Sequence, residues 1–398
     1  MEFIPELAYK YRLIALFLIS FISTMIVFKP ILRIAIKKDI VDNPDARKLQ
    51  KSPVPVMGGI AVFFGIMVGL CFYKTMISYT ALFPVVSAMT IMMYLGCMDD
   101  ILSIKPMTRF GIEFLVAATL VFGLKCCISN FQGMWGIDTV SFVVGVALSV
   151  LTFLGLVNAI NMIDGIDGLS TAFFILIFGC FGIFCFLSHD YSFAVLSAVC
   201  IGALLPFFLH NVFGYTTKMF IGDGGTMMMG TAISAMVFVI LREKNAIETL
   251  CPELDFSRIA FVVAVLSMPV ADTLRVMFRR MAHKKSPFSP DKTHLHHLFV
   301  AAGFSYISIT IIEIALDILV IGAFLLTWWL GGSLELQLYV TVATAALLNW
   351  GLAGIFTVSA KRKDKLYRAI EYLGAHSHVE RRGIWLHIQH LIDNKFEK

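Results

Sequence analysis

The sequence predicts an all-α, polytopic membrane protein, and three observations favour this fold class. Of the 398 residues, 58% are hydrophobic and only 15% are charged, whereas soluble domains carry about 25% charged residues. The mean hydropathy is +0.83. Apolar residues also gather in runs of about 20, the length that crosses a bilayer core as a helix. This composition excludes a disordered chain, a disulfide-rich secreted module and an ordinary cytosolic enzyme.

The apolar runs define about eleven predicted transmembrane helices, which together form one membrane domain over residues 1–357. A basic cytoplasmic tail follows at 358–398. The eight cysteines contain no CxxC pair and fall mostly in apolar segments, so neither a disulfide nor a zinc framework is expected. The predicted spans are 12–29, 57–74, 80–98, 109–127, 138–157, 169–188, 192–213, 225–241, 256–276, 307–330 and 336–357.

The distribution of Lys and Arg predicts the orientation of these spans. The segments that follow odd-numbered spans, with the tail, hold 25 of the 32 basic residues, and the opposite side holds 7. Basic residues favour the cytoplasmic side. We therefore expect the N-terminus outside and the tail inside. The net charge of +5 gives no indication of nucleic acid binding.

The chemistry-bearing polar residues fall in these same cytoplasmic segments, which predicts an active site on the cytoplasmic face. The outer loops hold nothing comparable. Four segments carry the residues, namely 98–101, 158–168, 220–226 and 286–297. The candidate residues in them are two asparagines, five aspartates and three histidines: Asn158, Asn161, Asp99, Asp100, Asp164, Asp167, Asp223, His294, His296 and His297.

The adjacent carboxylates of Asp99 and Asp100 have two interpretations. They repel each other, so a site that holds both normally has a cation or a proton between them. Oxygen ligands of this kind suit Mg²⁺. Alternatively, the pair is solvated or caps the next helix. The pair alone does not separate the two interpretations.

Residues 158–168 place Asn or Asp at every third position. Glycines within the segment make a continuous helix improbable, so we expect a helix end that runs into a tight polar loop. The segment contains no Lys or Arg. Its negative charge breaks the positive-inside trend and therefore requires a bound cation or a cationic side chain. An ordinary surface loop is the less favoured alternative.

The last two motifs are individually weak. Asp223 is flanked by glycines and precedes a predicted helix, and a helix N-terminus presents N–H groups to an anion. Asp-Gly is, however, also an ordinary turn. The three histidines lie beside basic residues and lack the separated ligand pair of a zinc site. We therefore expect them to meet phosphate; a solvated basic loop is the alternative. Two further pairs, Arg109 with Glu113 and Asp272 with Arg275, are interpreted as neutralising helix-surface contacts.

The ordered set of motifs resembles the polyprenyl-phosphate N-acetylhexosamine-1-phosphate transferases, of glycosyltransferase 4 type, over about residues 37–305. The HLHH form and the eleven spans are similar to the WecA/TagO branch, which uses UDP-N-acetylglucosamine. The MraY branch, which uses UDP-N-acetylmuramoyl-pentapeptide, typically has three consecutive histidines. Gly224 and Thr226 depart mildly from the family pattern. The matching segments are KSPVPVMGG, MYLGCMDD, NAINMIDGIDGLS, FIGDGGT and SPFSPDKTHLHHLF.

The resemblance implies a reaction: N-acetylglucosamine 1-phosphate, or a close 2-acetamido relative, passes from a UDP-N-acetylhexosamine to undecaprenyl phosphate in the bilayer. UMP is released, and synthesis of a lipid-linked cell-surface glycan, such as lipopolysaccharide or a cell-wall polymer, begins. The implied location is the cell (inner, cytoplasmic) membrane. The resemblance is also compatible with a homodimer.

The resemblance also implies residue roles. Asp223, helped by Asn161, would bind Mg²⁺, with Mn²⁺ as an alternative. Asp99 and Asp100 would orient or deprotonate the lipid phosphate. The remaining aspartates, Asp164 and Asp167, would organise the metal and nucleotide pocket. The implied substrate-binding residues are Lys51, Asn158, Gly224, His294, His296 and His297.

Three alternatives stay open. A secondary transporter would place its charges near the bilayer midplane on repeated, broken helices. The sequence instead gathers them at one face, which disfavours this class. A membrane-embedded metal-dependent phosphatase or hydrolase would also collect carboxylates and histidines around phosphate. The third alternative is an MraY-like phospho-N-acetylmuramoyl-pentapeptide transferase.

Overall fold

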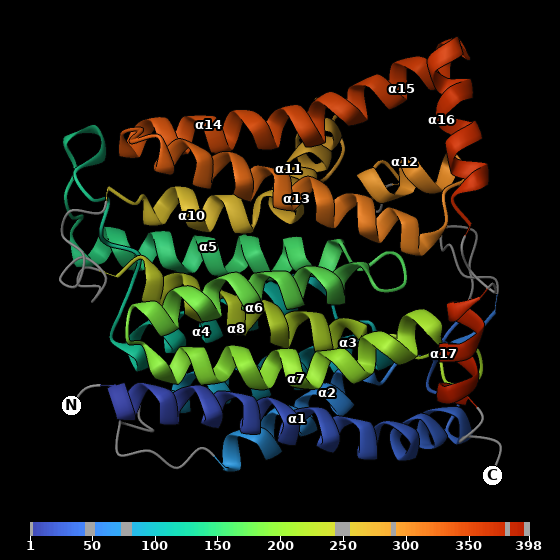
Figure 1. Cartoon of the computed structure of the whole chain (residues 1–398), viewed down its shortest axis with the longest axis horizontal. Coiled ribbons are helices and arrows are strands. Elements are labelled where there is room, and N and C mark those ends of the chain that lie inside the picture. The colour runs from blue at the N-terminus through green and yellow to red at the C-terminus, as the bar shows by residue number, and fades with distance from the viewer. Residues whose placement is uncertain are drawn as a thin grey trace.

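The computed structural model is a bundle of long helices that run side by side (Figure 1). It describes residues 3–43, 52–72, 82–242, 255–287, 292–378 and 383–393. In chain order the elements are α1 (Phe3–Lys37), β1 (Val41–Asp42), β2 (Val54–Pro55), α2 (Gly58–Cys71), α3 (Leu82–Leu102), α4 (Pro106–Leu124), η2 (Met134–Gly136), α5 (Phe142–Met162), α6 (Leu169–Leu187), α7 (Tyr191–Phe213), α8 (Gly222–Ile240), α10 (Arg258–Val265), α11 (Ser267–Ala282), α12 (Leu295–Ala301), α13 (Tyr306–Trp329), α14 (Leu334–Ala346), η3 (Leu347–Gly351), α15 (Leu352–Arg362), α16 (Lys365–His376) and α17 (Ile384–Asp393).

The predicted class of helical membrane protein is confirmed at the level of its helices. Among the described residues, nine helices are long and apolar enough to cross a membrane. The predicted span 256–276 is two helices, α10 and α11, bent by 73°, and counting this pair as one span gives ten. The predicted span 57–74 contains α2, whose 14 residues rise about 21 Å, less than the ~30 Å of a bilayer core. The described part of the chain therefore does not reach the predicted eleven.

Helix α8 forms the centre of the bundle. Nearly all of its residues are buried, and it packs against α3, α5 and α2. Small residues permit this close packing, as at Gly230, which lies against Val157 of α5. A helix buried on all sides cannot be displaced without moving its neighbours. The N-terminal turn of α8, which carries Asp223, is therefore held in a fixed position.

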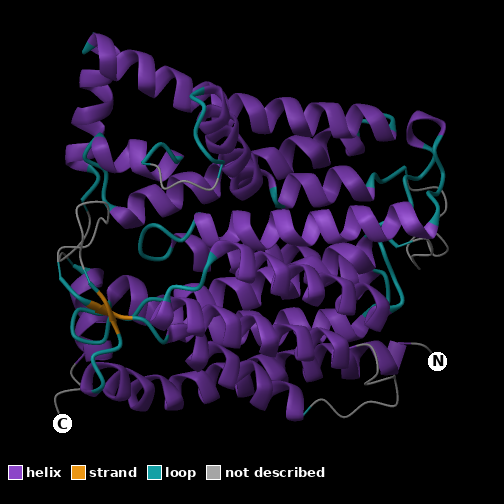
Figure 2. Ribbon diagram, turned by 180° about the vertical axis from the view of Figure 1, so that it is seen from behind, coloured by secondary structure: helices purple, strands orange, loops and turns teal. Residues whose placement is uncertain are grey.

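The two ends of the bundle differ. Helices α12, α16 and α17 gather at one end, together with the C-terminus, whereas the N-terminus lies at the other (Figure 1). The small β1–β2 sheet also lies at the C-terminal end (Figure 2). It is antiparallel and pairs Val41 with Pro55. Large apolar side chains such as Ile26, Phe83 and Trp329 point outward along the helices with exposures of 70%, 74% and 76%, as expected of surfaces that meet lipid.

The C-terminal region is more ordered than a simple basic tail. The long helical segment of α14, η3 and α15 continues to Arg362, beyond the boundary predicted at residue 357. Two further helices, α16 and α17, follow it. Both contact the bundle, α16 beside the loop after α12 and α17 beside the end of α7. The tail thus contacts the membrane domain at the end of α16 and through α17, while most of its described residues are exposed.

Candidate active site

A cavity of about 1070 Å³, lined by both charged and apolar side chains, lies at the end of the bundle that carries α12 and α17. Its walls come from the ends of α3, α4, α5, α8 and α12 and from two loops, 163–168 and 214–221. Ten of the twelve residues predicted as site residues line it. Gly224 lies just behind the wall, and Lys51 lies outside the described residues. The ten are Asp99, Asp100, Asn158, Asn161, Asp164, Asp167, Asp223, His294, His296 and His297.

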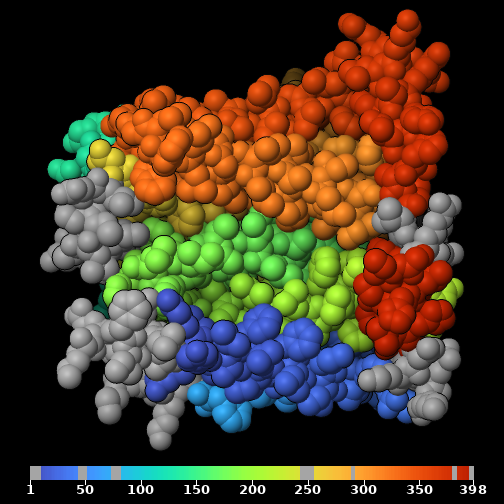
Figure 3. Space-filling model, in the orientation of Figure 1, coloured from blue at the N-terminus to red at the C-terminus, as the bar shows by residue number. Residues whose placement is uncertain are grey.

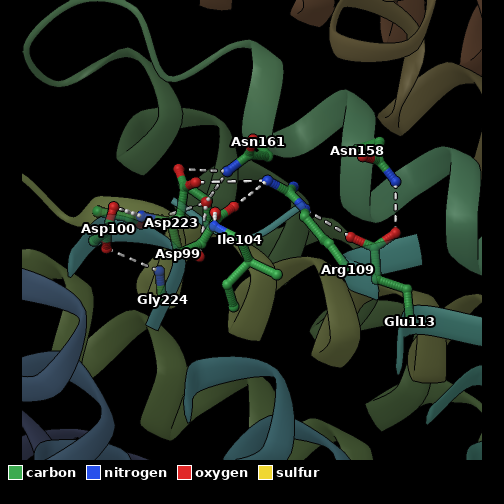
Figure 4. Close-up of polar contacts among 11 residues, drawn as sticks. Asp99, Asp100, Ile104, Arg109, Glu113, Asn158, Asn161, Asp223 and Gly224 are labelled. Atoms are coloured by element: carbon green, nitrogen blue, oxygen red, sulfur yellow. Dashed lines mark hydrogen bonds and ion pairs between the residues drawn. The ribbon is translucent and has the colours of Figure 1, made fainter. Parts of the chain in front are cut away.

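Asp223 stands at the entrance to α8, and its carboxylate faces the cavity. The amide nitrogen of Asn161 donates hydrogen bonds of 2.9 Å to Oδ1 of Asp223 and of 2.9 Å to the Thr226 hydroxyl. A guanidinium nitrogen of Arg109 lies 3.5 Å from the other oxygen, Oδ2 (Figure 4). Side chains from α4, α5 and α8 therefore converge on one carboxylate. This convergence joins residues separated by up to 117 positions in sequence.

Asp100 caps the N-terminus of α8. Its carboxylate accepts hydrogen bonds from the backbone N–H groups of Asp223 at 3.1 Å and Gly224 at 3.5 Å. The turn before it uses Gly222, whose φ of +72° suits glycine. The helix N-terminus was expected to meet a substrate anion. In the structure the anion that it meets is the protein's own Asp100.

The crossing of α3 and α8 explains why these carboxylates lie together. Gly96 lies against the backbone of Asp223 and Gly224, so that any side chain at residue 96 would overlap it. A β-carbon on Gly224 would in turn stand 2.7 Å from Sγ of Cys97. The two glycines let the helix backbones touch one turn before Asp100. Close contact at this crossing therefore positions Asp100 beneath the start of α8.

Arg109 joins the carboxylates of α3 and α8, which the sequence interpretation missed. It donates a hydrogen bond of 3.0 Å to Oδ2 of Asp99 and another of 2.9 Å to Oε1 of Glu113. The second oxygen of Glu113 accepts a bond of 2.8 Å from the amide of Asn158. The predicted neutralising contact of Arg109 with Glu113 forms, but the pair lies in the cavity wall and not on an outer helix surface. The sequence did contain a signal for the role of Arg109, because this cation follows the adjacent aspartates Asp99 and Asp100 within ten positions.

The loop after α5 carries Asp164 and Asp167. A helix end followed by a polar loop was predicted here, and α5 ends at Met162. Burial against the cavity wall raises the pKa of Asp164 to about 7, and a hydrogen bond of 2.6 Å from Ser170 opposes that rise. Burial also raises the pKa of Asp167, while its ion pair with Lys218 opposes the rise. Lys218 is the cationic side chain that this acidic loop was expected to require. No motif singled it out, because it stands alone before the glycine turn.

The histidines form another part of the cavity wall. Nδ1 of His294 lies 2.7 Å from Oδ2 of Asp272, whose other oxygen accepts bonds from Arg275 at 2.6 Å and from the backbone N–H of Leu295 at 3.0 Å. Asp272 therefore fixes the His294 ring so that Nε2 is the atom left for a ligand. The predicted contact of Asp272 with Arg275 forms, but it is not on the helix surface, since Asp272 is 3% exposed.

His296 lies against the acidic loop. Its ring rests on Gly165, at a distance that leaves no room for a side chain there. Burial lowers the pKa of His296 well below its usual value, and the neighbouring histidines lower it further. Among the described residues its buried Nδ1 has no hydrogen-bond partner. Ring centroids of His296 and His297 are 4.4 Å apart.

Two acidic residues of α13 have a structural explanation. Oδ1 of Asp317 accepts hydrogen bonds from the Ser267 hydroxyl at 2.6 Å and the Met268 N–H at 3.1 Å. It thereby caps α11 at the point where the chain bends from α10. Glu313 is buried one turn away, near Asp272 of α11. Both residues belong to the packing of the bent span rather than to the cavity wall.

The donor atoms around Asp223 suit Mg²⁺. Across the described ranges, no three His, Cys, Asp or Glu side chains are grouped closely enough to form a metal centre of their own. Mg²⁺ commonly uses only one or two carboxylates and completes its shell with water and phosphate oxygens. Asp223 and Asn161 both line the cavity, and a carboxylate and a side-chain amide oxygen are ligand types of this kind. The residues present therefore fit this ion better than a metal that needs a full protein cage.

The fold and this cavity together define a polytopic membrane protein with a polar pocket at one end of its helices. The sequence profile described as "Glycosyl transferase family 4" matches residues 82–241. This match covers α3 to α8, which supply Asp99, Asp100, Asn158, Asn161, Asp164, Asp167 and Asp223.

Curated relatives match a larger part of the chain. The Bacillus subtilis protein named probable undecaprenyl-phosphate N-acetylglucosaminyl 1-phosphate transferase is 30% identical, over 74% of this chain and 79% of its own. Proteins of Salmonella typhimurium and Escherichia coli K12, each named undecaprenyl-phosphate alpha-N-acetylglucosaminyl 1-phosphate transferase, are 29% and 27% identical. They align over 74% and 69% of this chain and 77% and 72% of their own. The chain therefore belongs to glycosyl transferase family 4, the family of polyprenyl-phosphate sugar-1-phosphate transferases.

Proposed function

We propose that the protein transfers N-acetylglucosamine 1-phosphate from UDP-N-acetylglucosamine to undecaprenyl phosphate and releases UMP. The observation that carries this proposal is the cavity at the end of the bundle. Seven carboxylates, four Lys or Arg side chains and three histidines line it, from segments far apart in sequence. Such a charged cavity, on helices that suit a bilayer, fits a water-soluble nucleotide and a lipid phosphate at once. The names of the relatives support the same substrates.

The proposed reaction forms one phosphorus–oxygen bond and breaks another. An oxygen of the lipid phosphate attacks the β-phosphorus of the nucleotide sugar, and the bond from that phosphorus to the bridging oxygen breaks, so UMP leaves. Both reactants are anions, so the site must offset their mutual repulsion. Catalysis of this kind rests on positioning and on charge stabilisation.

Arg109 is the cation closest to the proposed reaction centre. Its 3.0 Å contact with Asp99 and 3.5 Å contact with Asp223 fix its charge between two elements of the wall. We assign Arg109 to the phosphates and Asp99 to the orientation of Arg109 and of the lipid phosphate. The lipid phosphate is already largely ionised near pH 7, so Asp99 does not have to act as a base. Glu113 and Asn158 keep the guanidinium directed toward the cavity.

The opposite wall is assigned to the nucleotide. Lys218 and His294 present a cation and an imidazole Nε2 toward the cavity, where they can meet the leaving uridylate. His296 and His297 supply hydrogen bonds beside them. The pKa of about 7 at Asp164 lets that carboxyl hold or release a proton near neutral pH. Lys51 stays a predicted pyrophosphate ligand.

We assign a Mg²⁺ ion, with Mn²⁺ as the alternative, to Asp223 and Asn161. When bound, the ion neutralises phosphate charge and polarises the reacting phosphorus–oxygen bonds. Asp164 and Asp167 would support the same region. The remaining ligands would be water and substrate phosphate oxygens.

The proposed orientation places the cavity in the cytoplasm, because both nucleotide sugar and most basic residues belong on that side. An impermeant maleimide added to intact cells should therefore fail to label a Lys292→Cys variant above the background of the unmodified chain. Asp138→Cys, on an exposed loop at the opposite end, is the matched control and should be labelled. Strong labelling at position 292 from outside would overturn the orientation.

A metal-dependent hydrolase is the competing proposal, and an exchange experiment separates it. Purified protein with undecaprenyl phosphate, Mg²⁺, UDP-N-acetylglucosamine and labelled UMP should return label to the nucleotide sugar, because transfer of the sugar phosphate is reversible. A hydrolase would release soluble phosphate or sugar phosphate and give no exchange.

The donor prediction distinguishes this chain from the pentapeptide-using branch. We expect kcat/KM for UDP-N-acetylglucosamine to exceed that for UDP-N-acetylmuramoyl-pentapeptide by at least about 100-fold on one preparation. The reason is the His294-Leu295-His296-His297 spacing. An inserted residue rotates a helical side chain by about 100°, so three consecutive histidines would present their rings differently. Equal use of the two donors would contradict the assignment.

A further inference from the structure

The C-terminal helix α17 packs across the ends of α1 and α7, beside the cavity. The ring of Trp385 lies 4.5 Å from that of Phe213, measured between centroids. Nζ of Lys29 lies 3.4 Å from the carbonyl oxygen of Ile392. In the space-filling view α17 covers the junction of these helices at the C-terminal end of the bundle (Figure 3). A helix at the end of the chain thus contacts the first helix and the seventh.

The last described residue of α17 binds the loop that leads from α7 to α8. Oδ2 of Asp393 accepts a hydrogen bond of 3.0 Å from the backbone N–H of Tyr215. Oδ1 accepts bonds from the N–H of Thr217 at 3.3 Å and from its hydroxyl at 2.9 Å. Both oxygens of one carboxylate are therefore used, and the loop backbone is held at two positions.

The residue after this anchor is Lys218, which pairs with Asp167 in the cavity wall. The loop on the other side of Lys218 has its own anchors. The carbonyl oxygen of Met219 accepts a hydrogen bond of 3.0 Å from the side-chain amide of Asn211. The N–H of Phe220 donates to the carbonyl oxygen of Pro55 at 2.8 Å, and the carbonyl oxygen of Phe220 accepts from the N–H of Gly58 at 2.9 Å. Asp393 supplies the matching restraint on the N-terminal side. There Thr217 also lies 3.0 Å from Nδ1 of His210.

We propose that Asp393 is a positioning residue: α17 holds the 214–217 segment through it, and so keeps Lys218 against Asp167 for the nucleotide substrate. This inference rests on the proposed function for its activity readout. The C-terminal tail then has a defined role in the site, although its residues are far in sequence from those that line the cavity. Its contribution passes through Lys218 and touches no substrate.

The test compares Asp393→Ala, Asp393→Asn and the matched control His390→Ala, which alters an exposed residue of the same helix. Asp393→Ala should lower kcat/KM for the UDP-sugar about tenfold, chiefly through KM, because the lost restraint misplaces a binding group. Asp393→Asn retains one carbonyl acceptor and should fall in between. His390→Ala should match the wild type. Backbone amides of Tyr215 and Thr217 should exchange hydrogen faster only in the Asp393 variants.

A double substitution separates positioning from general stabilisation. If Asp393 acts through Lys218, adding Asp393→Ala to Lys218→Ala should cause little further loss of activity. A full additional tenfold loss would contradict the proposal, as would an Asp393→Ala enzyme with normal KM. If the wild type shows no transferase activity, the proposed function fails instead. Amide exchange at residues 215 and 217 still tests the contact in that case.

Discussion

Asp223→Asn is expected to reduce turnover by at least about 100-fold while the protein stays folded and inserted in the membrane. The substitution keeps the size of the side chain and can still accept the hydrogen bond from Asn161, but it removes the negative charge. That charge faces both Arg109 and the proposed metal position, where charge stabilisation of the transition state is worth several kcal/mol. Rates should be measured over a range of Mg²⁺ concentrations with saturating lipid acceptor.

The matched control for this variant is Asp138→Asn, which removes a carboxylate from an exposed loop at the other end of the bundle. It should leave both the rate and the Mg²⁺ dependence unchanged. A near-normal rate for Asp223→Asn at limiting Mg²⁺ would remove Asp223 from the proposed metal site. Thermal unfolding in detergent should show the same midpoint for both variants to within a few degrees.

Gly96→Ala is expected to lower kcat/KM by about 10- to 100-fold, although residue 96 touches no substrate. A β-carbon there would overlap the backbone of Asp223 and Gly224, so α3 and α8 would have to separate. Asp100 would then lose its 3.1 Å bond to the N–H of Asp223. Misplacement of about 1 Å at a reacting group can cost two orders of magnitude in rate.

Gly155→Ala is the matched control, because this mid-helix glycine of α5 has no atom within 4 Å of an added β-carbon. It should leave activity unchanged and should not lower stability, because Ala favours a helix more than Gly does. If Gly96→Ala and Gly155→Ala behave alike, the α3–α8 crossing does not position the site. If Gly96→Ala lowers the unfolding temperature as well as activity, both effects trace to the same separation of helices.

The positions of the spans were largely predictable from sequence, because burial in a bilayer demands a long apolar run. The predicted span 169–188 became α6, Leu169–Leu187, and the predicted polar loop follows α5 at residue 163. The bend between α10 and α11 was not predictable, because mean hydropathy is the same for a straight and a broken span. It depends on a cap from Asp317, a residue of another helix.

The candidate site was predictable as a set of acidic and histidine motifs, but the cations that complete it were not. Arg109 resembled a helix-surface residue, since sequence shows only its neighbour four positions later. Its contact with Asp223 joins residues 114 positions apart. The contact exists only because the N-terminal ends of α4 and α8 meet at the same end of the bundle. Lys218 and Asp272 were missed for the same reason. Sequence patterns show which residues share a segment, whereas tertiary packing decides which segments meet.

The fate of the β-phosphorus tests the central claim most directly. Purified protein should be incubated with undecaprenyl phosphate, Mg²⁺ and UDP-N-acetylglucosamine labelled with ³²P at the β-position. The account predicts that the label moves into the lipid fraction together with N-acetylglucosamine, while UMP appears without label in equal amount. Label retained in UDP would mean that the sugar alone is transferred, and label released as water-soluble N-acetylglucosamine 1-phosphate would mean hydrolysis. Either result would contradict the proposed function.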